Sequence, residues 1–197
     1  MSAMDYSGPE RRRGGPDRRN VGEVTRILIV DDHALFRVGI ANILGREPDF
    51  EIVGEADDSR SAIDRAIETS PNVILMDLSL PSPGGIETTQ RIKRELPSTS
   101  IIVLAVSEDE DAQFDAIKAG AAAFILKDVG PDDLVTIIRR VVSGEYLIND
   151  KVFAKPSVAS RVLKEFRELA VYGQEAAPIF APLSPREVEI LTTSHRG

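Results

Sequence analysis

Short aliphatic runs alternate with amphipathic segments along the chain from Arg26 to Gly144. Aliphatic runs stand at residues 27–30, 51–56, 72–76, 101–106 and 123–126. Segments whose apolar residues recur at helical spacing stand at residues 33–47, 59–69, 85–96, 110–120 and 131–144. Because the runs are apolar on both faces, they are typical of parallel strands covered by helices on each side. The pattern predicts an α/β fold of five βα units around a central five-stranded parallel sheet.

Charged residues follow several of these predicted strands. Asp31 and Asp32 follow the first run, and Asp77 follows the third. Lys127 follows the fifth. Each residue alone is also typical of a helix cap, a turn or a solvated charge. Ligands of open parallel sheets bind beyond the carboxyl ends of the strands, however, and carboxylates gathered there repel one another unless a positive charge intervenes. The grouping therefore favours a cation site.

The donor set suits a hard divalent cation such as Mg²⁺, which prefers carboxylates, a backbone carbonyl and waters. Asp32 and Asp77 can supply the carboxylates, and the Ser79 carbonyl can reach back from the following loop. Asp31 can hold a metal-bound water. The Lys127 ammonium suits a phosphoryl group, because a metal and a lysine together neutralise the charge that develops in phosphoryl transfer. With no cysteine and no Ser–His pairing at this edge, a carboxylate is the candidate nucleophile.

Composition limits the remaining classes of function. The chain has 197 residues, which suits one domain with residues left for a linker or part of a second domain. Its net charge of -8 argues against a nucleic-acid or membrane surface on the molecule as a whole, so a DNA role would need a separate basic module. The absence of cysteine excludes disulfides and thiolate metal sites, and no apolar segment reaches membrane-spanning length. We expect a cytoplasmic protein without a membrane partner.

The motifs around these charges resemble the receiver domain of two-component response regulators. They are the acidic pair at 31–32, MDLSLPSPGGIE with Asp77, and AGAAAFILKD with Lys127. More narrowly, DDHALFRVGI, the KD after the fifth run and LSPREVEIL at 183–191 resemble the NarL/FixJ-like subfamily, whose C-terminal domain is a LuxR-type helix-turn-helix. The resemblance implies a flavodoxin-like (βα)5 fold.

The resemblance also implies a function and a set of roles. A sensor histidine kinase would phosphorylate Asp77, and Lys127 would pair with the phosphoryl group. Mg²⁺ or Mn²⁺ would be bound by Asp31, Asp32, Asp77 and the Ser79 carbonyl. The protein would be a signalling switch and not an enzyme, would form a homodimer on activation, and would control transcription through a DNA-binding domain that the sequence starts but does not complete.

The sequence departs from the family pattern at one position of the switch. The family has Thr or Ser at the end of the fourth strand, where this chain has Ala105, whereas Phe124 keeps the aromatic position of the fifth strand. Ser107 is a possible substitute hydroxyl, and it is also typical of a helix N-cap. The alternative function is therefore an interaction or dimerisation module that works without phosphorylation. An Asp-nucleophile phosphatase is a third candidate, but it would need a second catalytic acid where Ser79 stands.

The remaining segments complete the predicted domain organisation. Residues 1–24 form an Arg/Gly/Pro-rich tail predicted to be disordered, and residues 25–147 form the receiver. Residues 148–182 are predicted as a helical linker, and residues 183–197 as an incomplete helix-turn-helix domain that begins with Ser184 as N-cap. His33 is predicted to be a surface residue beside the acidic edge, and His195 a solvated residue of the C-terminal segment.

Overall fold

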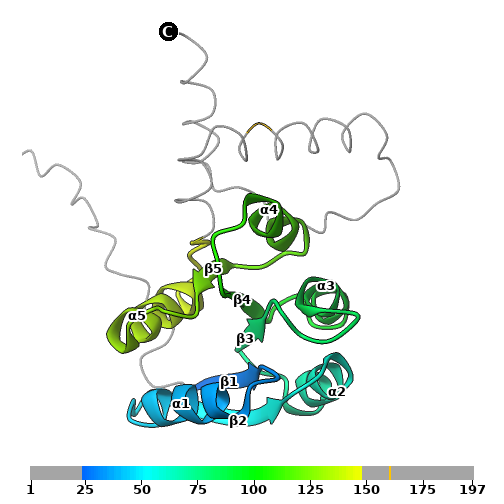
Figure 1. Ribbon diagram of the computed structural model, residues 1–197. Helices are drawn as coiled ribbons and strands as arrows, with labels where there is room; N and C mark the ends of the chain where they lie inside the picture. Colours follow the sequence, from blue (N-terminus) through cyan, green and yellow to red (C-terminus); the bar gives the residue numbers. More distant parts are fainter. Residues whose placement is uncertain (1–23, 148–159, 161–197) are drawn as a thin grey trace, which may run out of the picture.

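The computed structural model describes residues 24–147 and Ser160. Strands and helices alternate through it as β1 (Thr25–Val30), α1 (Ala34–Leu44), β2 (Phe50–Ala56), α2 (Ser59–Thr69), β3 (Val73–Asp77), α3 (Gly85–Glu95), β4 (Ser100–Ala105), α4 (Glu110–Lys118), β5 (Ala123–Leu126) and α5 (Pro131–Val142). The strands form one parallel sheet in the order β2-β1-β3-β4-β5. The prediction of five βα units around a parallel sheet is confirmed (Figure 1).

The predicted tail, linker and helix-turn-helix segment fall on residues 1–24, 148–182 and 183–197. Apart from Val24 and Ser160, they lie outside the described residues.

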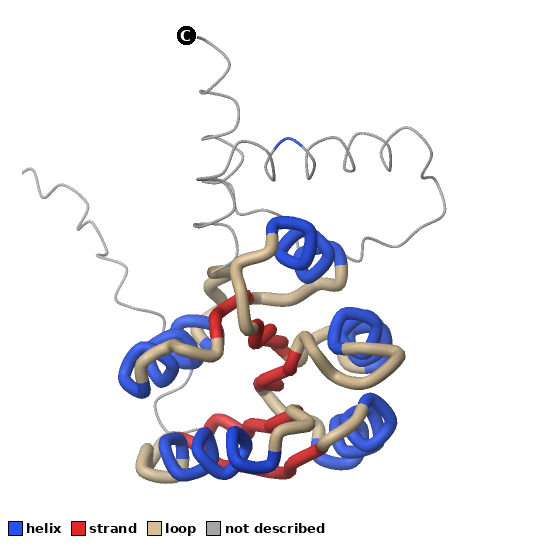
Figure 2. The backbone as a smooth tube through the Cα atoms, viewed as in Figure 1, coloured by secondary structure: helices blue, strands red, loops and turns tan. Residues whose placement is uncertain are grey.

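Helices cover both faces of the sheet, with α1 and α5 on one face and α2, α3 and α4 on the other (Figures 1 and 2). Alternate side chains of each strand enter different cores because successive residues of a strand point to opposite faces. Ile29 packs in the core that contains Ile138 of α5, whereas Leu28 packs in the core that contains Ala62 of α2 and Ile92 of α3. Burial on both faces explains why the central strands β1, β3 and β4 carry runs of consecutive apolar residues, whereas the edge strand β2 also contains glutamates.

Helix α1 is shorter than the periodicity predicts. The amphipathic pattern extends over residues 33–47, but the helix ends at Leu44, where the Gly45 N–H donates to the Ala41 carbonyl. Glycine just past the last turn and a proline shortly after it, here Pro48, commonly end a helix. Within residues 24–147 the helices contain 9 to 12 residues, and none of them has the length and apolarity needed to cross a membrane.

The strand order fixes where a site can form. After β1 the chain adds β2 on one side of it, and then crosses to place β3 on the other side. Helices that follow neighbouring strands to opposite faces leave a crevice at the carboxyl ends of those strands, and ligands of doubly wound sheets bind there. Here the crevice lies between β1 and β3, where Asp31 and Asp77 stand.

Candidate functional site

An ammonium and two buried carboxylates meet at this crevice. The Lys127 Nζ lies 2.7 Å from Asp31 Oδ2 and 3.0 Å from Asp77 Oδ2. Both carboxylate side chains are 0% exposed, and the lysine side chain is 15% exposed. The structure therefore brings together three residues that the sequence singled out at the ends of three separate strands.

Hydrogen bonds from backbone N–H groups position these residues at the carboxyl ends of their strands. The Asp31 N–H donates to the Ala56 carbonyl at 3.1 Å, and the Lys127 N–H donates to the Ala105 carbonyl at 2.8 Å. The Ser79 N–H donates to Asp77 Oδ1 at 3.0 Å, which fixes the orientation of that carboxylate. The side chains are thus presented by a backbone that continues the sheet.

Steric constraints explain the two glycines, Gly84 and Gly85, that follow the loop after Asp77. A Cβ atom on Gly85 would collide with the Asp77 carbonyl oxygen, so helix α3 can begin against the end of β3 only with glycine there. Gly84, just before it, has φ of 89°, a left-handed conformation that glycine adopts without strain. The Gly-Gly pair therefore lets the loop return to the sheet directly behind the acidic site.

Burial and charge oppose each other at this site. Burial raises the pKa of Asp77, and the nearby Asp31 charge raises it further, although the Ser79 N–H and the Lys127 ammonium act in the other direction. Burial lowers the pKa of Lys127, but its two carboxylate partners outweigh this effect and the pKa is raised overall. Lys127 is therefore held in its charged form, and one ammonium faces two carboxylates.

The acidic edge fits a divalent cation. Asp31, Asp32, Asp77 and His33 each offer one ligand atom, and these atoms lie within 4.8 Å of one another. Asp31 Oδ2 and Asp77 Oδ2 are buried, and both face the Lys127 ammonium, at 2.7 Å and 3.0 Å. Carboxylate oxygens are ligands that Mg²⁺ and Mn²⁺ prefer. The predicted ligand role of the Ser79 carbonyl stays a prediction.

His33 lies on the surface at this edge, as the sequence predicts. Its side chain is 67% exposed, but its Nδ1 lies 2.6 Å from Asp32 Oδ1 and 3.4 Å from Asp31 Oδ1. The residue follows the acidic pair directly and occupies the N-cap of α1. Its place directly after Asp31 and Asp32 is the sequence signal for this position, because residues that follow the carboxyl end of a strand lie at that edge of the sheet.

Helix α1 supplies two more contacts that the sequence did not reveal. The Lys127 Nζ lies 4.8 Å from the centre of the Phe36 ring, within the range of a cation–π interaction. Arg37 donates from Nη1 to the Asp31 carbonyl at 2.6 Å and pairs with Glu55 at 3.1 Å. Both residues lie one helical turn after His33, so helical spacing from the acidic pair was the only clue to them.

Comparison with known proteins identifies the domain. Residues 27–139 match the model of the response regulator receiver domain. The chain belongs to this family. As a receiver it is similar to LiaR, a transcriptional regulatory protein of Bacillus subtilis (strain 168), with 39% identity over 172 residues, which are 87% of this chain and 77% of LiaR.

Two further similarities agree with this assignment. The nitrate/nitrite response regulator NarL of Escherichia coli (strain K12) is 30% identical over 175 residues, covering 89% of this chain and 77% of NarL. The crystal structure of a LuxR-family two-component response regulator from Aurantimonas sp. SI85-9A1 has a TM-score of 0.61 at 30% identity, and the match covers 74% of this chain and 99% of that one. The predicted flavodoxin-like receiver fold and the resemblance to NarL-like, LuxR-family regulators are confirmed.

The predicted switch positions of this receiver lie close to the site. Ala105 is the last residue of β4, is 0% exposed, and packs in the same core as Phe124 of β5, which is 9% exposed. Ser107 is exposed two residues past the strand, and within residues 24–147 it makes no hydrogen bond to Asp77 or Lys127. Its role as a substitute hydroxyl stays a prediction.

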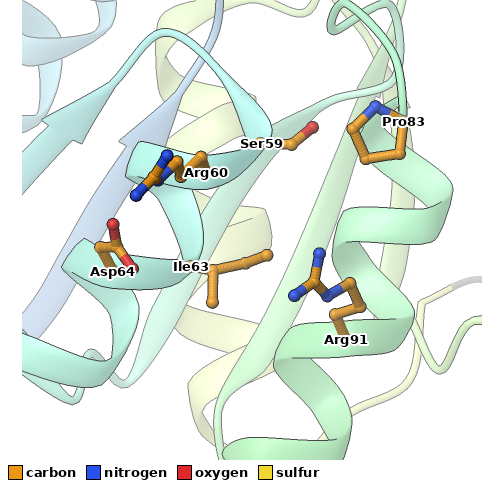
Figure 3. A pocket seen from close by; sticks show the side chains of 6 residues that line it. All are labelled: Ser59, Arg60, Ile63, Asp64, Pro83 and Arg91. Carbon is orange, nitrogen blue, oxygen red and sulfur yellow. The ribbon is translucent and has the colours of Figure 1, made fainter.

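A separate pocket of about 330 Å³ lies between α2 and α3 (Figure 3). Ser59, Arg60, Ile63, Asp64, Pro83 and Arg91 line it. The lining does not include Asp31, Asp32, His33 or Asp77, so this pocket is separate from the charged crevice of the receiver.

Proposed function

We propose that this receiver is a phosphorylation-dependent switch in which a sensor histidine kinase transfers a phosphoryl group to Asp77. The observation that carries the proposal is the single ammonium of Lys127, 3.0 Å from Asp77 and 2.7 Å from Asp31. The Ser79 N–H holds Asp77 Oδ1 at 3.0 Å, so this carboxylate has a fixed orientation beside the ammonium. Proximity and a preset charge are what phosphoryl transfer chiefly requires of a protein.

The proposed transfer forms one bond and breaks one. An oxygen of Asp77 donates an electron pair to phosphorus, the bond between phosphorus and the kinase histidine breaks, and the histidine nitrogen keeps that electron pair. Lys127 pairs with the phosphoryl oxygens and so leaves its position between the two carboxylates. A divalent cation, Mg²⁺ or Mn²⁺, would be held by Asp31, Asp32, Asp77 and the Ser79 carbonyl, and would supply further charge neutralisation.

We propose that the output is control of transcription, as for the relatives whose names describe regulators of transcription. In this proposal residues 25–147 are the receiver, residues 148–182 link it to a LuxR-type DNA-binding domain that begins at residue 183, and residues 1–24 are a tail. Activation would form a homodimer, and DNA would be bound only when the DNA-binding domain is complete. A cytoplasmic location and the absence of an enzymatic activity of its own belong to the same proposal.

A second candidate function rests on Ala105. Its methyl group offers no hydrogen bond to a phosphoryl group, so phosphorylation could fail to change the conformation of the chain. The receiver would then be a dimerisation or interaction module whose state does not depend on Asp77.

Phosphoryl uptake tests the first candidate. The wild type and Asp77→Asn would be incubated with Mg²⁺ and a small acyl-phosphate donor, and their intact masses measured. We expect one phosphoryl group on the wild type and none on Asp77→Asn. The variant should keep its fold, because Asn can still accept from the Ser79 N–H and because its neutral amide leaves Lys127 paired one-to-one with Asp31.

Sizing of the same samples separates the candidates. A larger species that appears only with the phosphoryl group supports the switch, whereas an unchanged size with full uptake favours the interaction module. Uptake by Asp77→Asn would place the acceptor elsewhere. No uptake from the small donor or from a histidine kinase would overturn the first candidate.

A further inference from the structure

The backbone of His33 is fixed at the acidic edge. Its N–H donates to Asp31 Oδ1 at 2.8 Å, and its carbonyl accepts from the N–H groups of Phe36 at 3.0 Å and Arg37 at 3.1 Å. These bonds hold the residue between the end of β1 and the first turn of α1. The imidazole is therefore tethered within reach of the carboxylates, even though most of its surface faces solvent.

The His33 side chain is directed to the carboxylates and not to the helix that it precedes. Residues at an N-cap usually use an oxygen to accept from the first turn, but His33 makes no such bond to α1. Its Nδ1 instead lies 2.6 Å from Asp32 Oδ1 and 3.4 Å from Asp31 Oδ1. The ring can turn and exchange with water, because the side chain is 67% exposed.

Asp31 has a different neighbour on each of its oxygens. Its Oδ2 faces the Lys127 ammonium at 2.7 Å, whereas its Oδ1 faces the His33 N–H and imidazole. A cation that joins Asp31, Asp32 and Asp77 must therefore lie on the side of the crevice that His33 borders. The ligand atoms of all four residues lie within 4.8 Å of one another, a spacing that one metal ion can bridge.

We propose that His33 is a nitrogen ligand of the divalent cation and that it makes the site prefer a first-row transition ion such as Mn²⁺ over Mg²⁺. The inference rests on the proposed cation site and deepens it. Mg²⁺ takes oxygen ligands almost exclusively, whereas the affinity of a site that includes imidazole rises along the transition series. Three carboxylates alone would hold either ion, so the preference for Mn²⁺ over Mg²⁺ comes from His33.

If His33 instead blocked the metal site, its removal would have the opposite effect on metal binding. An imidazolium that merely occupied the cation position beside Asp31 and Asp32 would have to leave before any metal could bind. Removal of His33 would then tighten the binding of Mg²⁺ and Mn²⁺ alike. Removal of a ligand would instead weaken the binding of Mn²⁺ and leave the binding of Mg²⁺ nearly unchanged.

The test uses the full chain loaded with Mn²⁺ alone. Pulsed electron paramagnetic resonance would detect the coupling of the metal to a directly bound ¹⁴N nucleus, and calorimetry would give the dissociation constants of Mn²⁺ and Mg²⁺. The variants are His33→Asn, which keeps a good N-cap residue, and His33→Ala. His195→Asn is the matched control, because the chain has 2 histidines.

We expect nitrogen coupling in the wild type and in His195→Asn, and its loss in both His33 variants. The Mn²⁺ dissociation constant should rise at least about tenfold in the His33 variants, because loss of even an outer partner of a metal ligand costs about 10–100-fold. The Mg²⁺ constant should change by less than about threefold, because Mg²⁺ takes oxygen ligands. Absence of nitrogen coupling in the wild type, its persistence in His33→Asn, or equal changes for the two ions would each overturn the inference.

This result is separable from the proposed phosphorylation. Neither measurement involves phosphoryl transfer, so nitrogen coupling in a chain that takes up no phosphoryl group would support His33 and reject the switch. Uptake on Asp77 without nitrogen coupling would do the reverse.

Discussion

Single atoms decide how this receiver could couple its site to its conformation. The Lys127 N–H donates to the Ala105 carbonyl at 2.8 Å, so residue 105 lies next to the lysine of the charged crevice. A hydroxyl there could bond to a phosphoryl oxygen, but the alanine methyl cannot. Ala105 and Phe124 belong to the same apolar core, so a change of packing at residue 105 can reach that aromatic side chain through this core.

Replacing Ala105 with Thr should strengthen dimerisation that depends on phosphorylation. A hydrogen bond to a charged group contributes roughly 1.5–3 kcal/mol, which corresponds to a population shift of about ten- to a hundredfold. Ala105→Val is the matched control, because valine has the shape of threonine without its hydroxyl and carries the same packing cost in a fully buried position. Sedimentation of both variants with and without the phosphoryl group measures the effect. Equal dimerisation of the two variants would remove the hydroxyl as the explanation.

At the scale of the elements, ion pairs connect α5 to the segment between α1 and β2, at the opposite end of the sheet from the site. Arg139 of α5 lies 2.6 Å from Glu47 and 2.7 Å from Asp49, both in the connection between α1 and β2. Its guanidinium also lies 5.2 Å from the centre of the Phe50 ring. The hydrogen bond from Arg139 lowers the pKa of Asp49. This cluster therefore connects the last helix of the receiver to its first βα unit.

Arg139→Met should lower the free energy of unfolding by at most about 1 kcal/mol, because the partners are partly exposed and screened. Since the folded-state pKa of Asp49 is depressed, its contribution is present above the unfolded pKa of about 3.9 and is lost as the pH falls through the lower folded value. The difference between variant and wild type should therefore shrink below about pH 4 and in concentrated salt. Urea unfolding across pH measures it.

Arg65→Met is the matched control for this prediction, because Arg65 pairs only with Glu68 of its own helix among the described residues. We expect a change within about 0.5 kcal/mol, as for most surface substitutions. A loss at Arg139 that was independent of both pH and salt would indicate packing on Phe50 and not charge.

At the scale of the whole molecule, the charged crevice has an apolar neighbour on the surface. Leu35 is 89% exposed and Val38 is 53% exposed, and both lie on α1 at a spacing that places them on one side of the helix. Leu35 lies in the first turn of α1, two residues after His33, so it borders the edge at which Asp77 would meet a phosphoryl donor, and Val38 lies one turn further along the helix. Exposed apolar residues beside a reactive site are a feature of surfaces that bind a protein partner.

Leu35→Ser should therefore slow phosphoryl transfer from a histidine kinase by about tenfold or more, the equivalent of about 1.4 kcal/mol of contact energy. Transfer from a small acyl-phosphate donor should be unchanged, because that donor needs no docking surface. Ile67→Ser is the matched control, since Ile67 is 52% exposed on α2. Single-turnover rates with both donors measure the effect. Equal slowing with the small donor would instead indicate damage to the site itself.

Much of the structure of this receiver can be predicted from the sequence alone. The period of the apolar residues predicted all the strands and helices of the described domain, because that period records which faces each segment buries. The same pattern placed Asp31, Asp77 and Lys127 at strand ends, and strand ends in a parallel sheet share one edge. Helix ends were predicted less well, as for α1, because the last turns depend on single capping residues such as Gly45.

Only the tertiary structure decided which of these residues touch. The strand order, the two carboxylates that share Lys127, the ring of Phe36 beside that ammonium and the imidazole of His33 beside Asp32 all depend on packing between distant segments. Periodicity is a local property of the chain, and it does not specify neighbours or distances. The sequence alone therefore determined the order of strands and helices along the chain, the fold class and the types of residue at the sheet edge, whereas tertiary packing decided the strand order and the geometry of the site.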